Sequence, residues 1–327
     1  MRLSSTLIVA AFSLLGAVAA AQQPGRVYRV GYTQIVDHPA LNATRQGFLD
    51  GLKAAGFVEG TNLVFEYQSA QGDVGNARNI ADKFLADKVD LMAPCTTPSA
   101  QAAVRVARGT GTPVVFGCVT NPVEAGIIAS LDKPTGSNVT GTYGFPPVAR
   151  MFDVIAQLRP NAKRIGTIYN AGESNSTTFA RLSKAEAEKR GLAWVEIAIS
   201  GSAEVKAAAD SLVGRVDALL LGQDNTVASA FDAVVKTARD NRLPLFSFDA
   251  TAVEHGAIAS FGQNQYQTGF DWAKELAAPV LQGRDPGTLV PVPYHAYDLQ
   301  LNTAAAAAVG ITLPPALIQA AARVTDH

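Results

Sequence analysis

The sequence predicts an α/β protein made of two doubly wound parallel-sheet lobes joined by a hinge. Short apolar runs alternate with amphipathic segments, the alternation starts again at residue 146, and a Gly- and Pro-rich stretch, 141–146, separates the two series. A chain of 327 residues is long enough to form two lobes, each with its own apolar core. Two such sheets side by side enclose a cleft between their strand ends, where ligands commonly bind.

The first series of elements runs from residue 27 to residue 141. Its strands are short apolar runs such as LVFEY, and its helices place their large apolar residues on one side. One helix ends at Gly56, because glycine readily adopts the left-handed conformation that terminates a helix. The predicted elements are strand 27–33, helix 41–55, strand 63–67, helix 76–86, strand 89–93, helix 99–108, strand 113–116, helix 122–131 and strand 138–141.

The second series repeats this alternation and is followed by a tail. Its first helix ends before Pro160, since the residue before a proline disfavours the helical conformation. The predicted elements are helix 146–158, strand 165–169, helix 179–191, strand 193–199, helix 203–212, strand 216–221, helix 227–241, strand 245–248, strand 257–261 and helix 269–281. The tail contains an extended stretch, 290–299, an Ala-rich helix, 304–308, and a helix that begins at the proline pair 314–315.

The first 21 residues are typical of a secretory signal peptide. Arg2 supplies a positive charge, 7–20 is an apolar run, and the alanines 19–21 fit the small-residue cleavage rule. We expect cleavage before Gln22 and a soluble periplasmic protein, with no Cys near that site to carry a lipid anchor. The net charge of −1 and the 17% of charged residues argue against a nucleic-acid partner, which would require a basic face.

The sequence contains two cysteines, Cys95 and Cys118, and each follows a predicted strand. If these strands are neighbours in a parallel sheet, their ends come within disulfide reach, and an exported protein meets an oxidising compartment. The alternative is a pair of buried free thiols, and this is the arrangement that we expect. Two cysteines and four scattered histidines have no metal-site spacing, so no metal is expected.

Polar turns follow several of the predicted strands and supply the candidate ligand-binding residues. Ligands of open α/β sheets bind outside the carboxyl ends of the strands, where such turns lie. Gln34 follows the first strand, and Tyr143 lies beside the expected hinge, as a wall of the site or as a core aromatic residue. The remaining candidates are Thr96, Thr97, Thr120, Asn121, Asn175, Ser176, Asp224, Asn225 and Asp249.

These residue types together describe a site for a zwitterion. Hydroxyl and amide groups at helix N-termini suit a carboxylate, because the free N–H groups point at the ligand. Asp224 and Asp249 are the acceptors for an ammonium group. The alternative is a purely structural role, in which Thr96, Thr120, Thr226 and Asp224 cap helices and Asp249 is a turn residue. We interpret His38, before Pro39, as a surface or turn residue.

No catalytic motif is found in the sequence. It contains no G-x-S-x-G elbow, no Walker loop and no G-x-G-x-x-G after a strand. Glu173 is a candidate for acid–base chemistry but has no visible partner. We therefore expect a binding protein without a cofactor rather than an enzyme.

The chain resembles the substrate-binding proteins of ABC transporters, in the group that includes tryptophan- and tyrosine-binding lipoproteins. The resemblance spans nearly all of the mature chain and depends on a series of stretches in this order. They are QIVDHPAL at 34–41, GFVEGTNL at 56–63, VTNPVEAG at 119–126, YNAGESNS at 169–176, DNTV at 224–227 and VEHGA at 253–257.

This resemblance implies a type I periplasmic-binding fold, with three crossovers and closure on a ligand. It implies an N-terminal lobe of 26–142 plus about 264–285, and a C-terminal lobe of 143–263 plus the tail 286–327. The first lobe of related amino-acid binders holds the ligand carboxylate, and an acidic residue near the position of Asp249 helps to hold the ammonium. The partner is an ABC permease in the inner membrane, and the protein is expected to be a monomer.

Two differences from the family pattern are visible. The chain has no lipobox Cys, and the polar stretch 263–265 (QNQ) stands where an acidic residue is expected. We predict a periplasmic protein that captures an aromatic or other apolar amino acid. One alternative is another small polar solute such as a sugar, although Trp194, in a strand, and Trp272, on a helix, are poorly placed to stack on a ring. The other alternative is an exported hydrolase.

Overall fold

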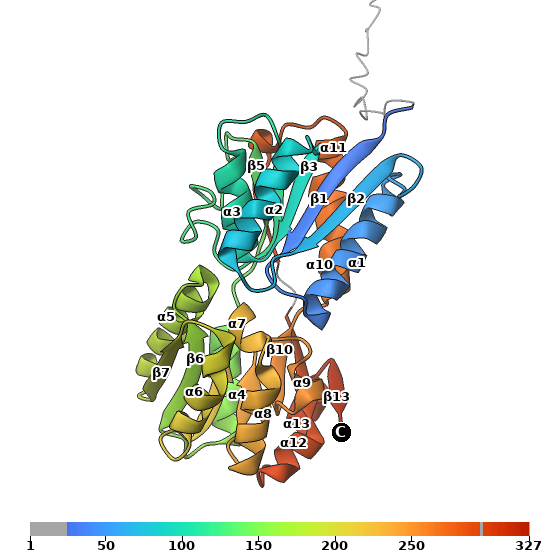
Figure 1. The fold of residues 1–327 in the computed structure, drawn as a ribbon. Helices are drawn as coiled ribbons and strands as arrows, with labels where there is room; N and C mark the ends of the chain where they lie inside the picture. Colours follow the sequence, from blue (N-terminus) through green and yellow to red (C-terminus); the bar gives the residue numbers. More distant parts are fainter. Residues whose placement is uncertain (1–24, 295–296, 327) are drawn as a thin grey trace, which may run out of the picture.

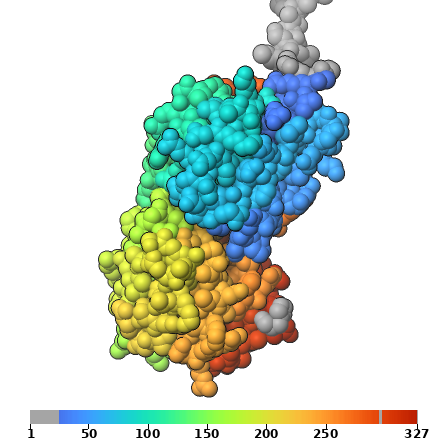
Figure 2. Space-filling model, viewed as in Figure 1, coloured from blue at the N-terminus to red at the C-terminus, as the bar shows by residue number. Residues whose placement is uncertain are grey.

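The computed structural model describes residues 25–294 and 297–326, which form two α/β lobes arranged end to end (Figure 1). The predicted signal peptide, 1–21, and its cleavage site before Gln22 lie outside the described residues. Figure 2 shows that the two lobes touch across a narrower waist. No helix in 25–294 or 297–326 is both long enough and apolar enough to cross a membrane.

The first lobe is built on a parallel sheet with the strand order β11-β5-β4-β3-β1-β2. Its strands are β1 (Tyr28–Gln34), β2 (Leu63–Ser69), β3 (Leu91–Cys95), β4 (Val114–Val119), β5 (Val139–Tyr143) and β11 (Val292–Pro293). Its helices are α1 (Pro39–Ala54), α2 (Val74–Ala86), α3 (Thr97–Ala107), α10 (Gln265–Trp272), the π-helical turn η2 (Ala273–Ala277), α11 (Ala278–Leu281) and the short η3 (Pro286–Thr288).

The second lobe is built on a sheet with the order β13-β12-β10-β9-β8-β6-β7, parallel except where β12 meets β10. Its strands are β6 (Arg164–Asn170), β7 (Ala193–Ile199), β8 (Ala218–Leu221), β9 (Leu245–Ser247), β10 (Ala259–Gly262), β12 (Asp298–Asn302) and β13 (Arg323–Thr325). Its helices are α4 (Val148–Leu158), α5 (Ser174–Lys189), η1 (Ser202–Glu204), α6 (Val205–Leu212), α7 (Asn225–Ala228), α8 (Phe231–Asp240), α9 (Ala252–His255), α12 (Thr303–Ala308) and α13 (Pro315–Ala320).

Each sheet carries an apolar layer on both faces, as the alternating pattern predicts. In the first lobe, α1 and α10 cover one face with Phe48 and Trp272, and α2 and α3 cover the other with Phe84. In the second lobe, α4, α5 and the C-terminal helices cover one face, and α6 and α8 cover the other. The predicted α/β architecture with two wound parallel-sheet lobes is thus confirmed.

The chain passes between the lobes after β5, after β10 and after β11, because the elements that follow belong to the other sheet. The last return is longer than the sequence indicated. Val292 pairs with Thr142 of β5, so the short strand β11 belongs to the first sheet. The expected start of the second-lobe tail at residue 286 is therefore too early, because part of the extended stretch completes the edge of the first sheet.

Two of the predicted helices are wrong. The stretch 122–131 forms successive turns, since Gly126 adopts a φ of +67° and both Ile127 and Ile128 donate their N–H groups to Pro122. The predicted helix 227–241 is divided into α7 and α8, because the chain leaves the helical conformation at Ala230, where φ is −129°. This break brings Phe231, the first residue of α8, into the wall of a cavity between the lobes.

The cysteines form a disulfide, Cys95–Cys118, and the expectation of two free thiols is wrong. The physical reason is that β3 and β4 are neighbours, with Cys95 paired in register with Gly117. Their Cα atoms lie 5.2 Å apart, within the normal range for a disulfide.

Candidate ligand-binding site between the lobes

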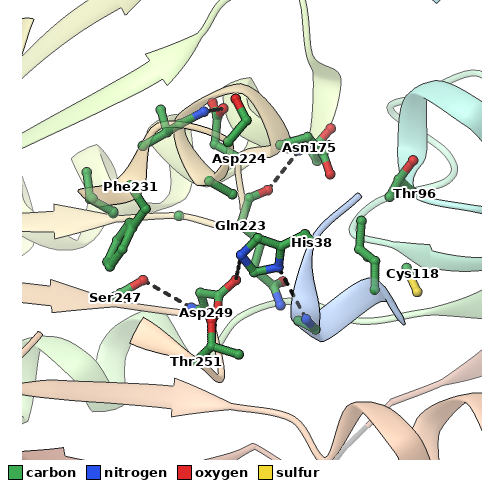
Figure 3. Close-up of a pocket in the computed structure, with 18 of the residues that line it drawn as sticks. His38, Thr96, Cys118, Asn175, Gln223, Asp224, Phe231, Ser247, Asp249 and Thr251 are labelled. Carbon is green, nitrogen blue, oxygen red and sulfur yellow. Dashed lines mark hydrogen bonds and ion pairs between the residues drawn. The ribbon is translucent and has the colours of Figure 1, made fainter. Parts of the chain in front are cut away.

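A cavity of about 320 Å³ lies between the two lobes, a volume typical of small-molecule sites. Figure 3 shows Thr96 and Cys118 on one side of it and Phe231 and Ser247 on the other, with His38 between them. The cavity is lined by the ends of parallel strands and the starts of the helices that follow, where free N–H groups and polar turns gather. Both lobes are therefore needed to form it.

The structure brings together seven of the predicted site residues. The seven that line the cavity are Thr96, Thr97, Thr120, Asn175, Asp224, Asn225 and Asp249. The other four, Gln34, Asn121, Tyr143 and Ser176, are not among its lining residues. Each of these four makes contacts that organise the turns behind the cavity wall.

Gln34 and Tyr143 hold the chain where it leaves β1 and β5. Gln34 is fully buried, and its Nε2 donates to the carbonyl of Val36 at 3.0 Å and to Asn42 Oδ1 at 2.9 Å. Tyr143 is half-buried at the hinge, with its ring edge-on to Phe145. These contacts fix the loop before α1 and the first crossover.

Asn121 and Ser176 serve as local partners in a similar way. Asn121 Oδ1 accepts the N–H of Glu124 at 3.2 Å, which closes the turn after β4. Ser176 is fully buried, and its Oγ accepts from Asn175 Nδ2 at 3.2 Å. Ser176 thus supports a neighbour that lines the cavity.

The first-lobe wall of the cavity is the N-terminus of α3. Thr97 is 1% exposed and lines the cavity, and its Oγ1 has no hydrogen-bond partner within the described chain. Thr96, the N-cap residue, makes no side-chain cap and donates instead to Ser99 Oγ at 3.3 Å. The start of this 11-residue helix therefore presents uncapped N–H groups and a free hydroxyl, which together suit an anionic group.

The second-lobe wall includes Asn175, at the start of α5. Asn175 Nδ2 donates to the carbonyl of Gln223 at 2.8 Å, which holds the amide plane in place (Figure 3). Its Oδ1 is buried and has no hydrogen-bond partner among the described residues. A buried oxygen of this kind is costly unless a donor reaches it. This wall therefore offers an acceptor to a donor inside the cavity.

The carboxylate of Asp224 lies in the wall, but both of its oxygens already accept from the backbone. Oδ1 accepts the N–H of Val227 at 2.8 Å and so caps α7, and Oδ2 accepts the N–H of Asn170 at 2.6 Å. Burial, together with the nearby carboxylate of Glu173, raises the pKa of Asp224 to about 6. The hydrogen bonds of Asp224 therefore connect the end of β6 to the start of α7.

Glu173, the catalytic candidate of the sequence, is a buried connector. Its Oε1 accepts the N–H of Thr226 at 3.0 Å and the Thr226 hydroxyl at 2.7 Å, while Oε2 accepts from Asn225 Nδ2 at 2.5 Å. The start of α5 is thereby joined to α7. With its oxygens used in this way, Glu173 is placed to support the wall.

Asp249 presents a freer carboxylate oxygen to the cavity. Its Oδ1 accepts the N–H and the hydroxyl of Thr251, at 2.7 and 2.6 Å, which fixes the turn after β9. Its Oδ2 lies 3.8 Å from His38 Nε2, on the opposite lobe (Figure 3). Asp249 therefore meets the first lobe across the cleft with one oxygen already anchored.

His38 was interpreted from the sequence as a surface or turn residue, and the structure places it in the cavity wall. Its Nδ1 accepts the N–H of Ala40 at 3.3 Å, as the N-cap of α1. This bond leaves the ring proton on Nε2, which faces Asp249. The available signal was its position in the loop between β1 and α1, which corresponds to the polar turns that follow the other strands.

Other lining residues were missed because they come from unexpected segments. Phe231 reaches the cavity through the break before α8, and Tyr294 reaches it from the last crossover. The Tyr294 hydroxyl accepts the N–H of Cys118 at 2.9 Å, and burial raises the pKa of Tyr294 to about 12. Nothing local in the sequence connects these residues with the cleft.

The charges of the cavity are one-sided. Among the described residues that line it, Asp224, Asp232 and Asp249 are acidic and none is Lys or Arg. An anionic group in this cavity therefore meets neutral donors and helix N-termini, whereas a cationic group meets carboxylates. Within the described ranges, no group of His, Cys, Asp and Glu is placed to hold a metal ion.

The fold and the cleft define a two-lobed protein that encloses a small ligand. The family model of the ABC transporter substrate binding proteins matches residues 29–325, and the chain belongs to this family. The tyrosine-binding protein of Clostridioides difficile (strain R20291) is 38% identical over 260 residues, which cover 80% of this chain and 74% of that protein.

Two solved structures match more than nine-tenths of the chain. One is the ABC domain in complex with L-Trp from Streptococcus pneumonia, with 28% identity, a TM-score of 0.87 and coverage of 91% of this chain and 99% of that chain. The other is the ligand-free, open structure of a substrate binding protein with adhesive properties from Clostridium difficile. It has 35% identity, a TM-score of 0.69 and coverage of 92% of this chain and 100% of that chain.

Proposed function

We propose that this protein captures an aromatic or other apolar amino acid in the cleft, outside the inner membrane, and delivers it to an ABC permease. The observation that carries the proposal is the placement of unpaired polar atoms on opposite walls. Thr97 Oγ1 and Asn175 Oδ1 are buried without partners in the described chain, and Asp249 Oδ2 faces the same cavity. A zwitterion supplies the matching acceptor and donors.

In the proposed complex, the ligand carboxylate lies at the N-terminus of α3, where Thr97 and free N–H groups receive it. The ammonium group lies toward Asp249 and Asn175. The side chain extends along the apolar surface of Val227 and Phe231. The names of the relatives, one binding tyrosine and the other solved with L-Trp, support an aromatic side chain.

The mechanism is hinge closure around the ligand, with the closed form recognised by the permease. The lobes here are arranged more like those of the L-Trp complex (TM-score 0.87) than those of the open, ligand-free relative (TM-score 0.69). Sequence similarity alone would favour the opposite order, since the open relative is 35% identical and the L-Trp complex 28%. The comparison supports a closed state in which both walls reach the ligand.

Titration calorimetry on residues 22–327 tests the proposal, with a panel of amino acids, aromatic acids without an amine, sugars and nucleosides. We expect heat of binding and a raised melting temperature with Tyr, Trp, Phe or Leu. At a ligand concentration 100 times the dissociation constant, binding should raise the free energy of unfolding by about 2.7 kcal/mol. Binding of sugars alone would contradict the zwitterion site. Turnover of an ester or amide would favour a hydrolase instead.

Asp249→Asn is the decisive variant in this panel. It keeps the Oδ1 that accepts from Thr251 and removes the charge that faces the ligand ammonium. Loss of a charged hydrogen bond costs about 1.5–3 kcal/mol, so we expect Kd to rise about 10- to 150-fold. Asp240→Asn, on the exposed surface of α8, is the control for the same chemical change and should bind like wild type. Equal affinity in the two variants would remove Asp249 from the site.

A further inference from the structure

The disulfide lies in the wall of the candidate site. Cys95 is the last residue of β3, and Thr96 and Thr97 follow it directly into the cavity wall. Cys118 lines the cavity itself, with its sulfur beside the first-lobe wall in Figure 3, and Thr120 follows two residues later. One covalent bond therefore joins the two turns that form this half of the site.

The backbone on both sides of this bond is unusual. Thr96 has a φ of +91° and Cys118 a φ of +55°, a region that residues other than glycine rarely adopt. The pairing of β4 with β5 also shifts in register between Phe116 and Val119. Such conformations persist only where the surrounding structure holds them, and they gather at functional sites. Here the disulfide links the two segments that contain these residues.

We propose that the Cys95–Cys118 disulfide is a positioning element of the ligand site, so that affinity for the amino acid depends on its oxidised state. This inference rests on the proposed function. The disulfide holds the start of α3 against β4, which keeps Thr97 and the free N–H groups of α3 aimed into the cleft. Without it, the two turns must be held by hydrogen bonds alone, such as the 3.1 Å bond from Thr96 N–H to the Gly117 carbonyl.

The position of the disulfide also means that ligand binding should affect reduction of the disulfide. Cys95 is fully buried, while Cys118 is half-buried and lines the cavity, so a reductant reaches the bond through the cleft. A thiolate of a dithiol attacks Cys118 Sγ, forms a mixed disulfide and releases Cys95 as a thiolate, which takes up a proton. The second thiol of the dithiol then displaces Cys118, leaving two protein thiols and an oxidised, cyclic dithiol.

A ligand enclosed between the lobes covers this path. Because coupling between two sites is reciprocal, a ligand that binds the oxidised form more tightly must lower the equilibrium constant for reduction of the disulfide by the same factor. Two independent measurements follow: the affinity of the protein without the disulfide, and the equilibrium constant for reduction of wild type by dithiothreitol with and without ligand.

The first measurement compares the dissociation constants of L-Tyr and L-Trp for oxidised wild type and for Cys95→Ala/Cys118→Ala. We expect Kd to rise at least 10-fold while the far-ultraviolet circular dichroism and a cooperative thermal transition are retained. Leu212→Ala, in the core of the second lobe on α6, a helix whose residues do not line the cavity, is the control for lost stability without a change in the site. It should lower the melting temperature and leave Kd within about twofold.

The second measurement needs no variant and holds if the double variant fails to fold. We expect saturating L-Tyr or L-Trp to lower the equilibrium constant for reduction of wild type at least 10-fold, measured by thiol titration after equilibration in mixtures of reduced and oxidised dithiothreitol. Unchanged Kd in a folded double variant, or an equal equilibrium constant for reduction with and without bound ligand, overturns the inference alone. Oxidised wild type that binds no amino acid overturns the proposed function as well.

Discussion

The carboxyl group of Asp224 shows how a residue of the wall can be defined by its bonds rather than by its exposure to the cavity. It lines the cleft, yet its oxygens accept from Val227 and Asn170 and so join α7 to β6. The sequence allowed two interpretations, an ammonium ligand and an N-cap, and the structure places Asp224 as the cap of α7. The freer oxygen belongs to Asp249, whose turn is closed by Thr251.

The raised pKa of Asp224 gives a pH dependence of stability with a definite sign. Burial, and then the nearby carboxylate of Glu173, raise the pKa of Asp224 from its ordinary value of 3.8 to about 6. The folded state therefore binds the proton more tightly, so the free energy of unfolding gains as the pH falls from about 7 to about 4. The shift corresponds to about 3 kcal/mol at most.

Asp224→Asn removes this titration and keeps an oxygen that can cap α7. Urea unfolding of both proteins between pH 7 and pH 4.5 checks the expectation. The measured quantity is the difference between the two proteins, in which the carboxyl groups other than Asp224 and its neighbour Glu173 cancel. We expect wild type to gain stability relative to the variant as the pH falls. A difference that stays constant with pH would show that Asp224 is ionised as easily in the folded state as in the unfolded one.

At the scale of elements, the contact between α1 and α10 is the closest approach in the first lobe that glycine makes possible. A Cβ on Gly269 would lie 1.9 Å from the carbonyl oxygen of Thr44, and a Cβ on Gly47 would lie 1.9 Å from that of Tyr266. In Figure 1, α10 lies beside α1, although residues 55–264 separate them in sequence. This contact anchors the chain after its second crossover.

We expect Gly269→Ala to lower the free energy of unfolding by about 1–3 kcal/mol, because the helices must move apart to admit a methyl group. Gly111→Ala is the matched control, since a Cβ there meets nothing within 4 Å. Its effect should stay within about 0.5 kcal/mol. Urea unfolding followed by circular dichroism measures both. Equal unfolding midpoints of the Gly269→Ala and Gly111→Ala variants would show that α1 and α10 can accommodate the methyl group without loss of stability.

Local pattern predicted most of the strands and helices, because each has an apolar face of the right period. It failed where tertiary geometry decides. The turns of 122–131 and the break before α8 depend on the backbone at Gly126 and Ala230, which periodicity does not register. The polar turns at strand ends could be located because the apolar pattern shows where each strand ends. His38 was set aside because its partner, Asp249, lies on the other lobe.

At the scale of the whole molecule, two lobes and a hinge were predicted, while the contacts that hold the lobes together were not. The return strand β11 was placed in the wrong lobe, because Val292–Pro293 is too short to carry a pattern. A contact between the lobes, here called the clasp, was also not predicted. It joins Glu124 of the first lobe, in a stretch predicted as a helix, to Thr178 and Arg181 of α5. Glu124 accepts from the Thr178 hydroxyl at 2.6 Å and from Arg181 Nη2 at 2.5 Å.

This clasp joins the lobes only when they are together, so its loss should favour the open form. Thr178 and Arg181 lie three residues apart on one face of α5, and Thr178 is 2% exposed, so one of the two bonds is sheltered from water. Because the ion pair itself is exposed, we expect a modest contribution of about 1 kcal/mol in total. Glu124→Ala should therefore raise the Kd of the proposed amino-acid ligand about fivefold, mainly through faster dissociation.

Stopped-flow fluorescence gives the dissociation rate, and small-angle scattering of the ligand-free protein gives the balance between open and closed forms. Glu59→Ala, on the exposed surface of the first lobe, is the control for the loss of one carboxylate and should match wild type in both. The double variant Glu124→Arg/Arg181→Glu reverses the ion pair and should recover part of the affinity, because the opposite charges meet again across the rim. A dissociation rate unchanged by Glu124→Ala would mean that the hinge and the cavity contacts alone set closure.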